Sequence, residues 1–556
     1  MRRIGALLIC VLLLVSLFAG CAGKKGTPST TTAPTQPAGP VELSLEEKLA
    51  HIATLGSSPD DNYRVWYEMF VYAFCDSNGD GIGDFKGATS KLDYLQQLGI
   101  NGIWLMPIHA STSYHKYNVT DYYTVDPKYG TMEDFDEFLS ECNKRGIKVI
   151  LDLVVNHTGN RHNWFLTARK YLQSLNGKEP DPAECQYVDY YNFVLTKNAP
   201  STGYAKIPNS DYSYECKFSN DMPDLKLENP TVRKEVEDIM KFWMDKGVGG
   251  FRVDAAKEFY SGNTPKNVEV LSWLQQAATA IKPDAYMVAE VWDSFNTIAQ
   301  YYKSGFTSIF NYRYGASTGS LASTVRGAGR ENVVNRYARE LEQTHKAYVA
   351  SNPNYIDAPF GSNHDVGRLA GFATRDEEKV KLIGAMNLFM SGSAFIYYGE
   401  EIGMVCGAMD DPSYRAPMVW NEAGDNGTAK PAPGCTLPES YEFGSVETQL
   451  NDEDSVFNYY RQAVAIRQAM PVISHGVITE EKALNVGTVS AQRKTWGEEE
   501  CIILMNIDPK ANDVDLSAYK DWKLAVTLTA NDGHVYMDGD VLKMAAYGIA
   551  ILVPAN

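Results

Sequence analysis

Short apolar runs alternate with amphipathic helical patterns along the chain, from about residue 62 to about residue 400. The helical patterns repeat apolar residues every three or four positions, on one face of a helix, and they cover 91–98, 132–145, 230–246 and 268–281. The runs between them have the length of buried strands and lie at 65–74, 102–107, 149–155, 250–254, 286–291, 306–310, 356–360 and 394–398. Repeated strand–helix units form parallel sheets. Eight of them predict an α/β fold, a closed (β/α)8 TIM barrel.

Two parts of the chain depart from this alternation. Residues 157–229 follow the third apolar run, and they are polar, aromatic and without a clear period. Because a compact domain rarely carries so long a structureless loop, we expect an inserted subdomain there. After residue 470 the pattern changes to short strands with turn signals, at 472–478, 488–493, 501–507, 523–528 and 548–553. We therefore expect a barrel domain at 45–470, which contains the subdomain, and an all-β sandwich domain at 471–556.

The segment 1–21 predicts a signal peptide. Two arginines precede an apolar run at 4–18, and small residues follow it directly before Cys21. This run is shorter than the roughly 20 residues that a membrane-spanning helix needs. The end of the segment resembles a bacterial lipobox, although Phe18 stands where leucine is usual. The resemblance implies an extracytoplasmic lipoprotein, anchored to a membrane by a lipid on Cys21, with the Pro/Thr/Ser/Gly-rich residues 22–44 as a flexible linker.

Composition narrows the possible partners. The chain is 44% hydrophobic and 22% charged, as globular proteins are. Its net charge of −18 argues against a nucleic-acid partner, because phosphate binding requires clustered lysines and arginines. Two of the nine cysteines lie in the predicted signal peptide, so an odd number remains and at least one thiol is free. Cys185 with Cys216, and Cys406 with Cys435, are possible disulfides, because spacing alone does not decide the pairing.

Polar residues end or follow four of the predicted strands. They are Asp152 and His157 at the third, Asp254 at the fourth, Glu290 at the fifth, and His364 and Asp365 at the seventh. The carboxyl ends of barrel strands meet at one mouth, where the active sites of such barrels lie. Ionisable side chains are costly to bury. Their presence at four strand ends therefore indicates a functional site rather than four independent structural residues.

Arg252 and Asp254 are two residues apart on the fourth predicted strand, so their side chains share a face. A fixed cation beside a carboxylate favours the ionised form and lowers the pKa of the carboxyl group. An ionised carboxylate that is held in place suits a covalent nucleophile. A structural ion pair at the end of the strand is the alternative that these residues alone leave open.

The order and spacing of these motifs resemble those of the α-amylase superfamily, retaining glycoside hydrolases built on a (β/α)8 barrel. The segments 79–85 (GDGIGDF) and 122–130 (YYTVDPKYG) also match motifs of that family, and the resemblance covers roughly 62–470. The segment 222–226 (MPDLK) is similar to that of the group intermediate between oligo-1,6-glucosidases and neopullulanases, although Lys226 stands where asparagine is usual. Some members of this group are lipoproteins.

By position, the resemblance implies that Asp254 is the nucleophile and Glu290 the general acid/base. It implies that Asp365 is a third carboxylate, which binds hydroxyls of the sugar and stabilises the transition state. Retaining hydrolysis uses two carboxyl groups about 5–5.5 Å apart, and adjacent strand ends supply such a separation. Glu290 must carry a proton to act as an acid, whereas Asp254 must be ionised.

The resemblance also implies several substrate contacts. Tyr117 with His115 would form an aromatic platform under the cleaved sugar, and His157 and His364 would donate hydrogen bonds to its hydroxyls. Arg252 would keep Asp254 ionised, and Arg368 would orient Asp254 and Asp365. Lys257 would lie on the leaving-group side. Glu258 replaces the histidine that often follows this lysine in the family's α-amylases. Ala255 stands where α-1,6-acting relatives tend to carry valine, which favours α-1,4 specificity.

The loop after the first predicted strand is a second candidate site. Its oxygen donors are the side chains of Asp76, Asn78, Asp80 and Asp84 and the main-chain carbonyl of Ile82. Oxygen ligands at alternate positions around glycines suit Ca²⁺. The loop begins like an EF-hand, but its twelfth position is Gly87 rather than glutamate, and it resembles the calcium loop of the family instead. A glycine- and aspartate-rich turn without metal is the alternative.

Together these features predict a calcium-binding enzyme, acting as a monomer, that hydrolyses α-1,4 bonds in starch, glycogen or malto-oligosaccharides by double displacement. A 4-α-glucanotransferase and an oligosaccharide α-glucosidase share the same catalytic residues and are the alternatives within enzymes. A non-catalytic glucan-binding surface protein is the alternative of another class. The three intact carboxyl groups argue against it.

Overall fold

The computed structural model describes residues 43–555 and is centred on an eight-stranded parallel barrel. The strands are β1 (Val65–Met69), β2 (Gly102–Leu105), β5 (Lys148–Leu153), β9 (Gly250–Val253), β10 (Tyr286–Ala289), β11 (Ser308–Phe310), β12 (Ile356–Ala358) and β13 (Ala394–Tyr397). They pair in parallel in the order β12-β11-β10-β9-β5-β2-β1-β13. A parallel bridge between Phe360 and Phe395 joins the two ends of this order and closes the sheet. The predicted (β/α)8 barrel is confirmed.

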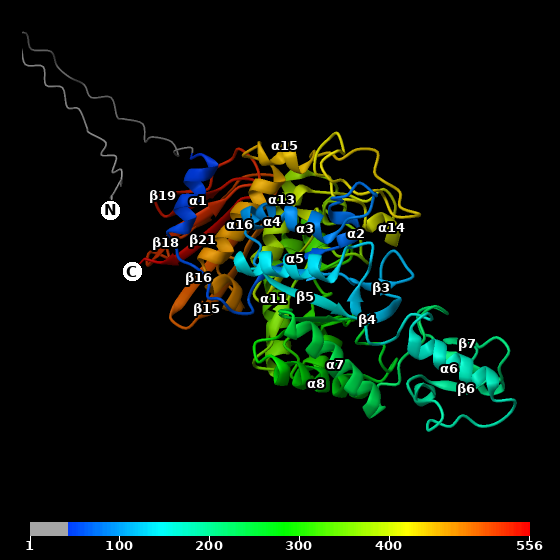
Figure 1. Cartoon of the computed structure of the whole chain (residues 1–556). Coiled ribbons are helices and arrows are strands. Elements are labelled where there is room, and N and C mark those ends of the chain that lie inside the picture. The colour runs from blue at the N-terminus through cyan, green and yellow to red at the C-terminus, as the bar shows by residue number, and fades with distance from the viewer. Residues whose placement is uncertain (1–42, 556) are drawn as a thin grey trace, which may run out of the picture. The chain divides into compact units, whose positions relative to one another are not determined.

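Helices connect the strands (Figure 1). The four helices predicted from the sequence are present as α4 (Leu92–Leu98), α5 (Met132–Lys144), α7 (Pro230–Asp245) and α8 (Thr264–Ile281). The longest of the other helices are α6 (Asn163–Ser174), α11 (Glu331–Ser351), α13 (Glu377–Leu388) and α16 (Val456–Ala469). α5 starts with a capping box between Thr131 and Asp134, and it buries Phe135 and Phe138 on its apolar face. α7 and α8 pack side by side. Each follows an asparagine cap and carries a proline in its first turn, which favours helix initiation there.

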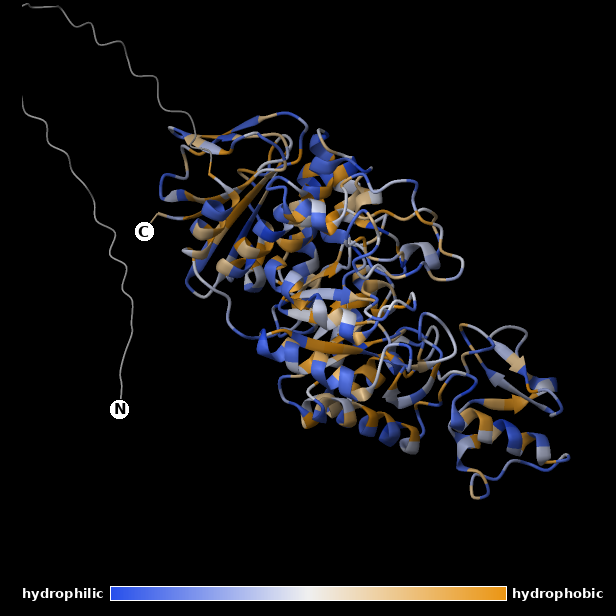
Figure 2. Ribbon diagram, turned by 45° about the horizontal axis from the view of Figure 1, so that its top comes forward, coloured by the Kyte–Doolittle hydropathy of each residue, from blue (hydrophilic) through white to orange (hydrophobic). Residues whose placement is uncertain are grey.

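The barrel interior is filled by side chains, because alternate strand residues point inward. The inward cluster is Trp66, Trp104, Ile150, Tyr286, Val288, Phe310, Ala358, Phe360, Val366 and Phe395. Trp66 stacks on Tyr286 with ring centroids 4.8 Å apart. Gly102 leaves the space that Trp66 needs, since a Cβ at this position would lie 2.5 Å from the indole ring. The outward strand residues pack in the main core, and several strands are strongly apolar (Figure 2). A packed interior leaves the mouth of the barrel for a site.

Two predicted strands are partly helical. The run 65–74 forms β1 and then the helical turn α2 (Val71–Phe74), and the run 472–478 forms the short helix α17 (Val472–His475) before β14 (Val477–Glu480). Both predictions were wrong in these parts because a short apolar run has no period that separates a buried strand from a buried helical turn. Pro471, whose φ is −54°, precedes α17 and suits a helical start.

The C-terminal part is a β-sandwich, as predicted. One sheet has the order β14-β15-β16-β21-β18, and the other has the order β17-β20-β19. The strands are β15 (Val489–Trp496), β16 (Glu499–Asn506), β17 (Asn512–Asp515), β18 (Trp522–Leu528), β19 (Tyr536–Asp538), β20 (Val541–Met544) and β21 (Ile549–Pro554). Ile502, Leu504, Leu542 and Leu552 belong to the core between the two sheets. The sequence analysis missed β17, β19 and β20 because each has only three or four residues.

The inserted segment after β5 is a small α/β unit rather than an irregular stretch. It contains α6 and a three-stranded antiparallel sheet of β6 (Phe193–Leu195), β8 (Tyr212–Glu215) and β7 (Tyr204–Lys206). Strands of three or four residues are too short to produce a periodic signal in the sequence. A hairpin of β3 (His109–Ser111) and β4 (Val119–Val125) follows β2 and carries the segment 122–130 in part.

The N-terminal features predicted from the sequence lie outside the described residues. These are the signal peptide, the lipid-modified Cys21 and nearly all of the linker, and they stay predictions. The first described helix is α1 (Leu45–Ala53), which Ser44 caps. No helix within 43–555 is both long and apolar enough to cross a membrane.

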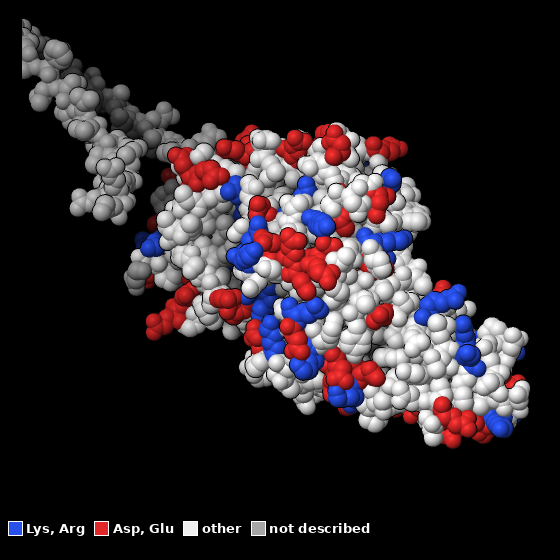
Figure 3. All heavy atoms as spheres, viewed as in Figure 1, with Lys and Arg blue, Asp and Glu red and all other residues white. Residues whose placement is uncertain are grey.

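The described residues also show the state of the cysteines and the distribution of charge on one face of the molecule. All seven cysteines within 43–555 are free, so the possible Cys185–Cys216 and Cys406–Cys435 disulfides are not formed. On the face shown in Figure 3, acidic side chains alternate with basic ones, and the described residues form no extended basic surface there.

Candidate active site

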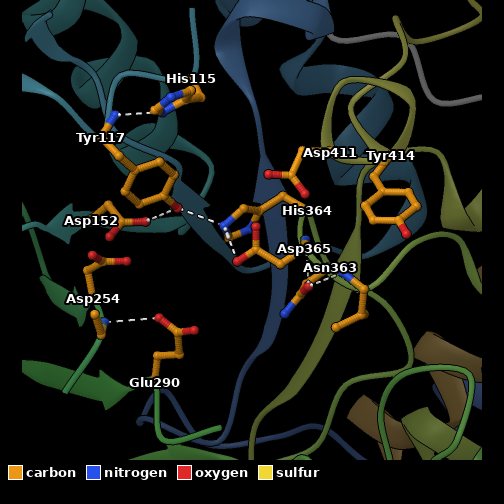
Figure 4. Close-up of polar contacts among 12 residues, drawn as sticks. His115, Tyr117, Asp152, Asp254, Glu290, Asn363, His364, Asp365, Asp411 and Tyr414 are labelled. Atoms are coloured by element: carbon orange, nitrogen blue, oxygen red, sulfur yellow. Dashed lines mark hydrogen bonds and ion pairs between the residues drawn. The ribbon is translucent and has the colours of Figure 1, made fainter. Parts of the chain in front are cut away.

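The strand ends bring the predicted carboxyl groups to one cavity of about 490 Å³. Asp254 and Glu290 directly follow the adjacent strands β9 and β10, and Asp365 follows β12 across the mouth (Figure 4). The cavity is lined by His115, Tyr117, His157, Phe218, Met222, Asp254, Ala255, Lys257, Glu258, Glu290, Trp292, Asp365, Asp411 and Arg415. The structure thus unites the three predicted catalytic carboxyl groups with four of the predicted substrate contacts.

Arg252 is the buried centre of the carboxyl cluster. Its Nη1 donates to Asp152 Oδ1 at 2.8 Å and to Asp254 Oδ1 at 2.5 Å, and its Nη2 donates to Glu290 Oε2 at 2.8 Å. Asp152 also accepts from Trp104 Nε1 and from the Tyr117 hydroxyl, and it is completely buried. Asp152 therefore supports Arg252 and Tyr117, as expected for a residue that is not itself a reactant.

One cation is too little to keep Asp254 ionised by itself. Burial raises the pKa of Asp254 to about 8; Arg252 opposes this rise, and the neighbouring Glu290 and Asp152 add to it. Arg252 lowers this pKa as predicted, but burial outweighs its effect, because the guanidinium is shared among three carboxyl groups in a site with little water. At neutral pH the Asp254 carboxyl group therefore carries a proton, and Arg252 joins it to Glu290. General acid catalysis needs a proton at this place.

The residue after Asp254 has a strained backbone. Ala255 has a φ of +48°, in the left-handed region, and its main-chain N–H donates to Glu290 Oε2 at 3.0 Å. Strain of this kind persists only where the surrounding structure enforces it. Here it aims a backbone donor at the Glu290 carboxyl group.

Asp365 lies in a different electrostatic setting. His364 Nε2 is 3.1 Å from Asp365 Oδ2, and Arg415 Nη2 donates to Asp365 Oδ1 at 2.8 Å. Burial alone would raise the pKa of Asp365, but His364 and Arg415 hold it well below its usual range. Asp365 is therefore ionised while Asp254 is protonated, so the cavity holds carboxyl groups in both states.

A buried carboxylate that the sequence did not identify sets the charge of His364. Glu68 on β1 pairs with His364 Nδ1 at 2.5 Å, and both side chains are almost inaccessible. Burial alone would lower the pKa of His364, but Asp365 and Glu68 raise it to about 10. The imidazolium thus bridges Glu68 and Asp365. The only sequence signal was an acidic residue inside an apolar run, which requires a partner when buried.

Tyr117, the predicted aromatic platform, lines the cavity, and its side chain contacts other protein side chains. Tyr117 donates its hydroxyl to Asp152 and lies 2.8 Å from His364 Nε2, and its ring stacks on that of His364. Burial lowers the pKa of His157 to about 4 and that of His115 to about 3, so both are neutral. His157 Nε2 lies 3.2 Å from the Tyr117 carbonyl. The roles of His157 and His364 as donors to a sugar stay predictions.

The prediction for Arg368 was wrong. This side chain is fully buried and donates to the main-chain carbonyls of Tyr398, Tyr414 and Ala416 rather than to a carboxylate. Arg415 performs the expected function at Asp365, and it comes from the long loop after β13. A lone arginine in a loop gives no periodic or spacing signal, so only the folded chain reveals it.

Lys257 lies in the cavity wall on the Glu290 side. Its Nζ is 2.9 Å from Asp293 and 3.2 Å from the Trp292 carbonyl. Trp292 is 49% exposed and stacks on Tyr312 with ring centroids 5.0 Å apart. Glu258, at the position where histidine was expected, faces Lys217 at 3.4 Å. The leaving-group role of Lys257 stays a prediction.

The predicted calcium loop is folded by its own hydrogen bonds. Asp76 accepts from the N–H groups of Gly79 and Gly81, both at 2.7 Å, and Asp84 accepts from Gly87 N at 2.7 Å. Within 43–555, no three His, Cys, Asp or Glu side chains are grouped so that they could hold a metal ion. Asp76, Asp80 and Asp84 thus do not form a group of three carboxylates, and the calcium ligands, which also include Asn78 and the Ile82 carbonyl, stay a prediction. The donor types, which are carboxylate, amide and carbonyl oxygens, nevertheless fit Ca²⁺.

Comparisons with known proteins agree with this geometry. Residues 68–476 match the family described as Alpha amylase, catalytic domain. Alpha-amylase 3 of Dictyoglomus thermophilum is 36% identical over 447 residues, which is 80% of this chain and 84% of the relative. Oligo-1,6-glucosidase of Parageobacillus thermoglucosidasius is 28% identical over 562 residues, which covers 84% of this chain and 95% of the relative.

Solved structures give the same result. Eubacterium rectale Amy13B superimposes with a TM-score of 0.87 and 39% identity, covering 92% of this chain and 99% of that one. The alpha-amylase from H. orenii superimposes with a TM-score of 0.77 and 33% identity, which covers 89% of this chain and 100% of that one.

Proposed function

This chain belongs to the alpha-amylase family of glycoside hydrolases, and we propose that it hydrolyses α-1,4-glucosidic bonds of starch, glycogen or malto-oligosaccharides with retention of configuration. One observation carries the mechanism. The cavity joins an ionised carboxylate, Asp365, with Asp254, whose pKa burial raises to about 8, and Arg252 holds Asp254 next to Glu290. Double displacement requires a carboxylate nucleophile and a protonated acid on opposite sides of one bond.

In this mechanism Asp254 attacks the anomeric carbon while Glu290 gives a proton to the glycosidic oxygen. A water molecule then attacks the glycosyl–Asp254 ester, and Glu290 accepts the proton that this water loses. Arg252 contacts both groups, so it stabilises whichever of them is negative at each step. Asp365, held by Arg415, binds hydroxyls of the same sugar and stabilises its positive charge in the transition state.

The bond specificity is less directly supported, because the relatives include both alpha-amylases and oligo-1,6-glucosidases. Ala255 supports α-1,4 action. At its φ of +48° a β-branched valine, typical of α-1,6-acting relatives, would be strained. An oligosaccharide α-glucosidase is the second candidate, supported by the oligo-1,6-glucosidase relatives. A 4-α-glucanotransferase would use the same residues with a sugar hydroxyl in place of water.

A product time course distinguishes these functions. We expect mixed malto-oligosaccharides early from soluble starch, no product longer than the substrate from maltotriose, and α-anomers as the first products by NMR. Products longer than maltotriose would identify a transferase, and glucose alone from starch would identify an exo-acting glucosidase. First products in the β-configuration would contradict the assigned roles of Asp254 and Glu290.

We also infer that the loop 76–84 binds Ca²⁺ through Asp76, Asn78, Asp80, Asp84 and the Ile82 carbonyl, as a structural ion away from the reacting bond. Removing an ion bound at 100 times its Kd costs about 2.7 kcal/mol. We therefore expect EDTA to lower the Tm by about 3–8 °C, and Ca²⁺ but not Mg²⁺ to restore it. Asp80→Asn, on an exposed side chain, should reduce the EDTA effect. An unchanged Tm in EDTA would contradict the calcium site.

A further inference from the structure

Glu68 is a buried acid that the mechanism above does not use. It lies at the carboxyl end of β1, two residues after Trp66 and therefore on the same inward face of the strand. Neither Glu68 nor its partner His364 lines the catalytic cavity, whereas Asp365 and Tyr117, which His364 contacts, do. We propose that Glu68 is a positioning residue that keeps His364 doubly protonated, so that two cations hold Asp365 during catalysis. The proposal rests on the function proposed above.

Both ring nitrogens of His364 face carboxyl oxygens. Nδ1 lies 2.5 Å from Glu68 Oε1, and Nε2 lies 3.1 Å from Asp365 Oδ2. The Tyr117 hydroxyl oxygen is 2.8 Å from Nε2, and its own proton is donated to Asp152 (Figure 4). A neutral imidazole has only one N–H, so its other nitrogen would present a lone pair to an ionised carboxylate. With both carboxyl groups ionised, these contacts are satisfied only when both nitrogens carry a proton.

The surroundings of the pair favour a charged His364. Burial alone would lower the pKa of His364, but Asp365 and Glu68 raise it to about 10. Burial raises the pKa of Glu68, and His364 and Arg252 oppose that rise. Glu68 and His364 are each only 1% exposed, so water has little access to either charge. The other titratable or charged groups that face the pair are Asp152 on β5, Tyr397 on β13, His115 and Tyr117 in the β3–β4 hairpin, and Arg415 in the loop after β13.

Glu68 thus acts on the substrate through His364 and Asp365. Asp365 is partly exposed in the cavity; His364 holds its Oδ2 and Arg415 holds its Oδ1. A charge-assisted hydrogen bond is roughly twice as strong as a neutral one. A cationic His364 therefore fixes Asp365 more firmly than a neutral one, and a fixed carboxylate stabilises the positive charge of the sugar in the transition state. Loss of the Glu68 charge should accordingly lower kcat.

Glu68→Gln separates the charge from the hydrogen bond. The amide has the shape of the carboxyl group and can donate to Nδ1, so a neutral ring with its one proton on Nε2 would keep both contacts. We would label the full chain with [13Cε1]histidine, whose shift reports ring protonation, and assign His364 among the nine histidines as the signal that His364→Gln removes. We expect an imidazolium in the wild type at pH 7 and 8.5, and a neutral ring in Glu68→Gln at pH 8.5.

The kinetics are then compared with this protonation state on p-nitrophenyl α-maltoside. Wherever His364 of Glu68→Gln is neutral, we expect kcat to be about tenfold below that of the wild type at the same pH, because a charge-assisted hydrogen bond has become a neutral one. Glu401→Gln is the matched control. Glu401 is also completely buried, but it accepts hydrogen bonds from Tyr67 and Tyr94. This control should keep both the His364 imidazolium and kcat.

Each outcome decides for or against the proposal. A neutral His364 in the wild type at pH 7 would mean that Glu68 holds the proton, and it would overturn the proposal, as would an imidazolium that persists in Glu68→Gln at pH 8.5. A neutral ring with an unchanged kcat, or a lower kcat at a pH where the ring is still protonated, would also overturn it. If the wild type cleaves no α-glucan, the proposed function fails instead, and the spectra alone still decide whether Glu68 sets the charge of His364.

Discussion

Glu290→Gln should lower kcat on soluble starch by at least roughly 10³-fold, because the amide cannot give a proton to the leaving oxygen or take one from water. The side chain keeps its shape, and its carbonyl oxygen can still accept from Arg252 and from Ala255 N. We therefore expect the Kd for maltotriose, measured by calorimetry, to change by less than about threefold. The loss should thus fall on kcat rather than on binding.

The leaving group sharpens this test. With p-nitrophenyl α-maltoside the departing phenolate needs little protonation, so the first step should survive in Glu290→Gln. The second step should be slow, because no base activates water, and a burst of p-nitrophenol should precede a slow steady state. Glu137→Gln, on an exposed position of α5, is the matched control and should leave kcat unchanged. Starch cleavage at the normal rate by Glu290→Gln would refute the assignment.

Arg252→Gln should lower the free energy of unfolding by about 3–5 kcal/mol at pH 7, because it removes the one cation that contacts three buried carboxyl groups. The loss should depend on pH. In the wild type, Asp254 has a folded pKa of about 8, above its ordinary value, so stability falls as pH rises toward 8. Without Arg252 this pKa rises further, and the deficit relative to wild type should grow with pH. Near pH 4 the Asp254 carboxyl group is protonated with or without Arg252, and the deficit should shrink.

Urea unfolding at pH 4.5, 7 and 8.5 measures this deficit. Arg145→Gln is the matched control, since Arg145 pairs with Asp93 and Glu141 at the surface. Such surface pairs contribute about 0–1 kcal/mol. A deficit for Arg252→Gln that stays below 1 kcal/mol, or that is equal at all three pH values, would show that Arg252 does not hold the carboxyl cluster together.

The barrel was predictable because its elements are long enough to carry a period. The helices α5, α7 and α8 contain a repeated pattern, the eight apolar runs alternate with such helical stretches, and the predicted catalytic carboxyl groups follow strand ends that topology must bring together. The failures come from shorter features. The helical turns α2 and α17 and the strands β17, β19 and β20 have too few residues for a pattern to distinguish them.

The sequence by itself determined the fold class, the positions of Asp254, Glu290 and Asp365, and the oxygen-rich loop at 76–84, because these depend on local pattern and strand order. The tertiary structure decided what surrounds each carboxyl group. Arg415 rather than Arg368 reaches Asp365, and Glu68 reaches His364, through contacts between segments far apart in the chain. Protonation follows from those contacts and from burial, which no local pattern reports. For this reason the sequence was enough to predict the reacting groups, and only the folded chain decided their charges.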